Sequence, residues 1–149
     1  MSLSQAVEIM TEIPVFRNLD PKRLKLFAIM GEELCFRAGE RLFEQGDEGD
    51  SAYVILEGEV DVLIPTPDGE ISVAVLCSKE IFGEMAVLCD QPRTTAIAAK
   101  TELRVLRLKR RTILDMLQEF PDIALEFVKV MADRLERTSQ QLAIERNAH

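Results

Sequence analysis

The sequence predicts an α+β fold in which an antiparallel β-roll, a jelly-roll-like double-stranded β-helix, lies between N-terminal and C-terminal helices. Helical spacing fills about the first thirty residues, short apolar runs separated by glycine turns follow, and helical spacing returns after Lys109. A length of 149 residues suits one domain with one core. We therefore expect a single domain over 1–149, with N-terminal helices in 1–32, the β-roll in 33–108 and C-terminal helices in 109–147.

Two helices are expected before the roll. Ser4 is a candidate N-cap for the first, which the segment 13–16 interrupts. Asp20-Pro21 restarts a helix, because aspartate caps well and proline fits the first turn, and Gly31 ends it. The apolar residues at helical spacing are Ala6, Ile9 and Met10 in the first helix and Leu24, Phe27 and Ala28 in the second.

The middle of the chain reads as many short strands. Glycine-containing turns separate them, and Asp68-Gly69 between two apolar runs is typical of a hairpin. This spacing indicates a sandwich or barrel. The expected strands are 41–44, 53–56, 60–64, 71–76, 96–98 and 103–108.

A short helix ending before Pro121 and a long helix from there towards Asn147 complete the fold. Along the long helix apolar residues alternate in steps of four and three, which is a heptad seam. This face either packs on the roll or forms the seam of a homodimer, and both interpretations stay open for the outer end. The seam residues are Ala124, Val128, Met131, Leu135, Thr138 and Leu142.

Composition excludes several classes of function. The net charge of −8 has the wrong sign for a reader of duplex DNA, so we expect no nucleic acid contact through this chain. The only histidine is His149, which removes histidine-dependent catalysis and metal sites from a folded core. We expect no enzyme activity, no bound metal and no catalytic residues. Cys35, Cys77 and Cys89 lack metal-ligand spacing and read as reduced, partly buried thiols of a cytoplasmic protein.

No apolar run is long enough to span a membrane, and the N-terminus lacks the pattern of a secretory signal. We therefore expect a cytoplasmic chain that makes no membrane contact of its own.

The segment 82–96, FGEMAVLCDQPRTTA, carries the functional signal. Gly83 allows the backbone to approach a ligand closely, and Glu84 to Leu88 suit one short helical turn whose free N–H groups attract an anion. Arg93 after Pro92 offers a planar fork for a phosphate. A carboxylate beside an anion site is better suited to accept hydrogen bonds from a sugar hydroxyl. The segment therefore reads as a phosphate-and-ribose clamp, unless Glu84 and Arg93 simply pair with each other.

These residues resemble the phosphate-binding cassette of the cyclic-nucleotide-binding family, which includes catabolite activator proteins, regulatory subunits of protein kinase A and cyclic-nucleotide-gated channels. The glycine-rich stretch 46–60, GDEGDSAYVILEGEV, resembles the glycine-turn strand pair of that family, and the segment 13–16 resembles its helical entry. The resemblance covers about 13–142. It implies a β-roll that binds cAMP or cGMP and needs no other cofactor.

The resemblance also implies roles for single residues. Arg93 would bind the exocyclic phosphate oxygens and Glu84 the ribose 2′-hydroxyl, while Gly83 and the amides of Met85 and Ala86 would line the phosphate. The sequence departs from the family pattern at Thr95, at Phe43 and at Ala52. We interpret the last two as core variants.

Two polar residues are candidates for the base. Thr94 matches a position where threonine is associated with cGMP, although it also occurs in proteins that respond to cAMP. Arg134 matches an arginine that contacts the base in channel-type members. The alternative for Arg134 is a solvated helix residue paired with Asp133 or Glu126.

The sequence thus predicts a regulatory module in which movement of the last helix transmits nucleotide binding. One alternative is an adaptor that has lost the ligand and kept the fold. Another is the sensor portion of a catabolite-activator-type regulator, whose DNA-binding part does not fit within these residues. The expected partners are the nucleotide and either a second copy of the chain or an effector domain.

Overall fold

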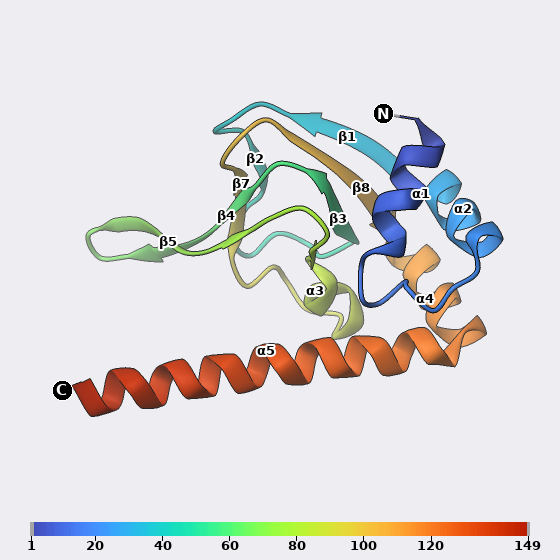
Figure 1. Ribbon diagram of the computed structural model, residues 1–149. Helices are drawn as coiled ribbons and strands as arrows, with labels where there is room; N and C mark the ends of the chain where they lie inside the picture. The colour runs from blue at the N-terminus through green and yellow to red at the C-terminus, as the bar shows by residue number, and fades with distance from the viewer. Residues whose placement is uncertain (1, 149) are drawn as a thin grey trace.

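The computed structural model describes the backbone of residues 2–148. It describes the side chains of residues 2–140, 143 and 144. Two helices precede the roll, a short helix lies within it, and two helices follow (Figure 1). The helices are α1 (Leu3–Thr11), α2 (Pro21–Met30), α3 (Glu84–Leu88), α4 (Arg110–Glu119) and α5 (Pro121–Ala148). The strands are β1 (Glu32–Phe36), β2 (Arg41–Phe43), β3 (Ser51–Glu57), β4 (Val60–Thr66), β5 (Gly69–Leu76), β6 (Ile81–Phe82), β7 (Ala96–Ala99) and β8 (Leu103–Lys109).

The strands form two four-stranded antiparallel sheets. One has the order β1-β8-β3-β6 and the other β2-β7-β4-β5. The β4–β5 hairpin turns at Pro67-Asp68, and Gly69 follows with a φ of 116°, so the predicted hairpin is confirmed. The predicted α+β class and the β-roll between flanking helices are confirmed as well.

Strand β3 has a core on each of its faces. Tyr53 and Ile55 point into the roll, where they pack with residues of both sheets. Ala52, Val54 and Leu56 point the other way, towards α1, α2, α4 and the start of α5. Successive side chains of a strand alternate between faces, and here both faces meet apolar partners. The roll and its helices therefore form one packed unit around β3.

The helix boundaries follow local chemistry. Asp20 caps α2 by accepting a hydrogen bond from the backbone N–H of Arg23, as expected. The N-cap of α1 is Ser2, so the prediction of Ser4 was wrong. The Ser2 hydroxyl and the Gln5 side chain form a reciprocal capping box, which Ser4 has no partner to match.

Helix α5 leaves the core partway along its length. Ile123 and Phe127 are buried, whereas Val128 and Leu135 are 62% and 69% exposed. Figure 1 shows α5 passing beneath α3 and the roll, with its C-terminal end below the tip of the β4–β5 hairpin. Thus the seam residues Val128 and Leu135 do not pack on the roll. The side chain of Leu142 lies outside the described residues.

The three cysteines are free and exposed, so the prediction of partial burial was wrong. Cys35 lies on edge strand β1, Cys77 directly follows β5, and Cys89 caps the end of α3. Each of these places leaves the side chain in contact with solvent. No helix within 2–148 is both long and apolar enough to cross a bilayer.

Candidate functional site

The site begins at a left-handed glycine. Gly83 joins β6 to α3 with a φ of 80°, and α3 starts at Glu84, as the sequence predicts. A side chain at Gly83 is excluded for a second reason, because its Cβ would lie 2.7 Å from Nη1 of Arg93. Glycine is therefore required both for the backbone turn and for the close approach of the arginine.

Arg93 is a buried cation held by carbonyl groups. Its side chain donates to the carbonyl oxygens of Gly83 at 2.9 Å and of Ser51 at 2.6 Å, and the residue is 4% exposed. Its Nε is buried and has no hydrogen-bond partner. None of the ion pairs found within 2–148 includes Arg93. Burial lowers the pKa of this guanidinium, which is the sign of a charge that has lost its water without gaining a full counter-ion.

Glu84 is the second buried charge, and its partner comes from α5. The carboxylate, on a residue 2% exposed, accepts from Nη1 of Arg134 at 2.5 Å. Nη2 of Arg134 donates to the carbonyl oxygen of Ile81 at 2.9 Å. Burial raises the pKa of Glu84, and the charge of Arg134 is the largest effect that opposes this rise.

These contacts decide two alternatives left open by the sequence. Glu84 and Arg93 do not pair with each other, because Glu84 binds Arg134 and Arg93 binds carbonyl groups. Arg134 is not a solvated residue paired with Asp133 or Glu126, because its guanidinium reaches into the site. The long helix thus contributes a charged group to the cassette.

One cavity brings together every residue that the sequence singled out for ligand binding. Its volume is about 160 Å³, smaller than the roughly 300–1,000 Å³ usual for ligand pockets. The residues predicted to bind the phosphate and the ribose line this cavity together with the two residues predicted to contact the base. They are Gly83, Glu84, Met85, Ala86, Arg93, Thr94 and Arg134.

Sequence reasoning missed the walls of the cavity that come from distant strands. Phe43 of β2 packs against the core of the roll, as expected of a core variant, but it also lines the cavity, which was not foreseen. The signal in the sequence that could have revealed this role was the departure of Phe43 from the family pattern. Ala52 is fully buried, as expected. Ser51 acts through its backbone carbonyl, which no side-chain pattern reveals. The other missed wall residues are Val62, Leu76, Phe82 and Ile97, whereas Thr95, expected near the pocket wall, does line the cavity.

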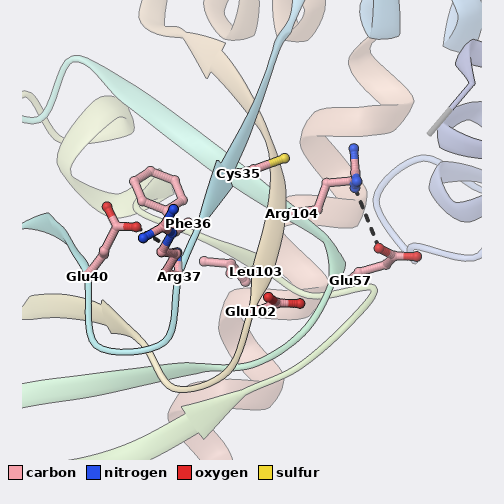
Figure 2. Close-up of a pocket in the computed structure, with 8 residues that line it drawn as sticks. All are labelled: Cys35, Phe36, Arg37, Glu40, Glu57, Glu102, Leu103 and Arg104. Carbon is pink, nitrogen blue, oxygen red and sulfur yellow. Dashed lines mark hydrogen bonds and ion pairs between the residues drawn. The ribbon is translucent and has the colours of Figure 1, made fainter.

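A larger hollow of about 370 Å³ lies away from the cassette, at the paired ends of β1 and β8 and beside the last residue of β3 (Figure 2). Several of its charged groups pair with one another, while the buried Nε of Arg104 has no hydrogen-bond partner. Arg104 pairs with Glu33 at 2.7 Å and with Glu57 at 3.5 Å, and Glu40 accepts from the backbone N–H of Arg37. In the described part of the chain, no group of three ligating side chains is placed to hold a metal ion. The chemistry therefore favours the smaller cavity.

A double-layered antiparallel roll with a buried, uncompensated arginine in its cavity defines a β-roll domain built to receive an anion. The sequence profile of the cyclic nucleotide-binding domain matches residues 33–120. The chain belongs to the cyclic nucleotide-binding domain family.

Named relatives are regulatory proteins. The CRP-like cAMP-activated global transcriptional regulator of Mycobacterium tuberculosis is 28% identical over 137 residues, which are 91% of this chain and 61% of the relative. A cAMP-dependent protein kinase regulatory subunit of Emericella nidulans is 33% identical over 66% of this chain and 24% of its own length.

Comparison of the fold with solved structures also finds a regulatory protein of bacteria. The catabolite activator protein of Thermus thermophilus superposes with a TM-score of 0.79 and 27% identity, covering 88% of this chain and 62% of that one. The chain thus spans about three fifths of the length of the Mycobacterium tuberculosis and Thermus thermophilus relatives.

Proposed function

We propose that the chain is a regulatory sensor that binds cAMP or cGMP, performs no chemistry on it and needs no further cofactor. One observation carries the proposal. Arg93 is buried without a carboxylate partner among the residues that the structure describes, its Nε has no hydrogen-bond partner, and the residue lines the same cavity as the buried carboxylate Glu84. A cyclic phosphate would satisfy the arginine, and a ribose hydroxyl would satisfy the carboxylate. The names of relatives activated by or dependent on cAMP support this ligand class.

Within this proposal each cavity residue has a role. Arg93 binds the exocyclic phosphate oxygens, while Gly83 and the amides of Met85 and Ala86 line the phosphate. Arg134 occupies Oε1 of Glu84, which leaves Oε2 to accept from the ribose 2′-hydroxyl. A carboxylate has lone pairs enough for both partners, so Arg134 and the ribose act on Glu84 together.

Transmission would pass through α5. The cavity is small for a nucleotide, and Arg134 of α5 forms part of its wall. Entry of a nucleotide therefore requires α5 or its arginine to shift. A ligand shifts such an equilibrium only by its differential affinity for the two positions of α5.

The chain would serve as the sensor portion of a longer regulator, which is consistent with the fraction of its bacterial relatives that it spans. We place it in the cytoplasm, with no nucleic acid or membrane contact of its own. The exposed seam of α5, with Val128 and Leu135, would join two copies of the chain.

Isothermal titration calorimetry with cAMP and cGMP tests the proposal. Arg93→Ala should weaken binding by about 1.5–3 kcal/mol, because a hydrogen bond to a charged group is lost, which is roughly ten- to a hundred-fold. Arg111→Ala is the matched control, since the Arg111 side chain is 88% exposed and pairs with Asp115, away from the cavity residues. Wild-type protein should also prefer cAMP over 2′-deoxy-cAMP, because Glu84 contacts the hydroxyl. Absence of binding of either nucleotide to folded protein would favour the ligand-free adaptor.

A further inference from the structure

We propose that Phe43 is a positioning residue for the phosphate-binding arginine: its ring holds the plane of the Arg93 guanidinium so that the free N–H edge faces the ligand. This inference rests on the proposed function, since it assumes that Arg93 receives a cyclic phosphate. It gives Phe43 a role beyond packing against the core, and the contacts of the ring with Arg93 support it.

The ring lies against the guanidinium face. Cζ of Arg93 is 4.1 Å from the centroid of Phe43 and 5.9 Å from that of Tyr53. An aromatic face attracts a cation through its quadrupole, and the attraction grows when water is excluded. Because Arg93 is buried and has no carboxylate partner in the described part of the chain, the ring is one of the few favourable environments for its charge.

The ring is itself held in place. Tyr53 and Phe82 stack at 5.1 Å with 11° between their planes, and Phe43 packs against both rings at 6.0 and 6.2 Å. The ladder between β2 and β7 also shifts by one residue between Arg41 and Phe43, which is a β-bulge. Bulges change the direction of a side chain and are frequent beside functional sites. Local backbone and aromatic packing thus fix the ring at the cavity.

The carbonyl groups contact the edge of the Arg93 guanidinium, and the Phe43 ring contacts its face. Gly83 and Ser51 each accept one bond from its terminal nitrogens, while Phe43 covers one face. Nε and the remaining N–H groups are left for a ligand. Without the ring, the guanidinium would keep its two carbonyl bonds and gain freedom to rotate about them.

A double-mutant cycle separates positioning from packing. Phe43→Leu keeps an apolar side chain and removes the π face, and it should weaken cAMP binding about five- to thirty-fold by calorimetry. Phe43→Tyr should bind within about threefold of wild type, because the face is restored. In an Arg93→Ala background, Phe43→Leu should have no further effect.

Leu76→Ala is the matched control, because Leu76 lines the same cavity from β5. Its effect on cAMP binding should be equal in the wild-type and Arg93→Ala backgrounds. If Phe43→Leu also behaves additively, or if Phe43→Tyr fails to restore binding, the ring only fills space and the inference is overturned while the proposed function stands.

A measurement without nucleotide tests the contact directly. The Nε–Hε proton of Arg93 should resonate at a displaced frequency in the NMR spectrum, because it lies in the ring current of Phe43. Phe43→Leu should move this resonance towards the ordinary arginine position. An unchanged resonance would overturn the inference whatever the protein binds, whereas wild-type protein that binds neither cAMP nor cGMP would overturn the proposed function.

Discussion

Glu84 is the residue whose ionisation should be visible in the stability of the protein. Burial raises its folded-state pKa above the ordinary value of 4.5. A raised carboxyl pKa means that the folded state holds the proton more tightly, so this group's stabilising contribution is full below about pH 4.5 and is lost as the pH rises through the folded value. Relative to Glu84→Gln, the unfolding free energy of wild-type protein should therefore fall with rising pH in this window.

Urea unfolding followed by circular dichroism at several pH values from about 4.5 to 7.5 measures this difference. Arg134→Ala should enlarge it, because Arg134 is the charge that most lowers the pKa of Glu84. Parallel pH profiles for wild type and Glu84→Gln would show that the folded state does not raise this pKa.

Thr94 is the residue at which base choice should be tested. It is exposed, lines the cavity, and its backbone carbonyl accepts a hydrogen bond from the Gln45 side chain at 3.2 Å, which steadies the segment. A threonine hydroxyl can meet the guanine amino group, which adenine lacks. Thr94→Ala should lower cGMP affinity by about 0.5–1.5 kcal/mol and leave cAMP affinity nearly unchanged. Equal losses in parallel titrations would remove Thr94 from base recognition.

The residues of the candidate site could be predicted where they are neighbours in sequence. Gly83, Glu84 and Arg93 lie in one segment, so their chemistry could be interpreted without knowledge of the fold. Phe43 and Ser51 could not be assigned in this way, because strand pairing brings them to Arg93 from 40 to 50 residues away. The direct Arg134–Glu84 contact was missed because the packing of α5 joins residues that are 50 positions apart in the sequence.

At the scale of elements, the sequence predicted strands best where turns mark them. The hairpin of β4 and β5 and the strands β3, β7 and β8 lie where the apolar runs place them. The two-residue strand β6 was missed, because it is defined by its pairing with β3. Two residues are too few to show the alternation of apolar and polar side chains that predicts a strand. The start of α2 was predicted because Asp20-Pro21 is a local signal.

Helix α5 is the element on which the switching mechanism can be tested. Arg134 is its direct link to the cassette. Nucleotide binding should slow hydrogen exchange over residues 123–142, and Arg134→Ala should reduce this protection and weaken binding of both nucleotides. Arg137→Ala is the matched control on the same helix, since Arg137 is 78% exposed and pairs with Asp133. Equal exchange with and without ligand in wild-type protein would place the switch in another element.

At the scale of the whole molecule, the exposed seam of α5 predicts an assembly of two copies. Val128 and Leu135 are separated by one heptad and are mostly exposed, an arrangement typical of a parallel coiled-coil seam. Leu135→Glu should convert a dimer into a monomer in sedimentation velocity experiments, because it places a charge in the seam. Glu136→Ala, at the next position, should leave the dimer intact. Wild-type protein that sediments as a monomer at high concentration would contradict this prediction.

The aromatic cluster behind Arg93 has a spectroscopic consequence. The chain contains no tryptophan and a single tyrosine, and that tyrosine is Tyr53, stacked on Phe82 and 5.9 Å from the arginine. At wavelengths that phenylalanine does not absorb, the protein's emission therefore originates from a ring stacked directly on Phe82, which lines the cavity. An anion arriving at Arg93 changes the electric field at this one fluorophore. Occupancy of the site can thus be followed by the intrinsic tyrosine fluorescence of the protein, without an added label.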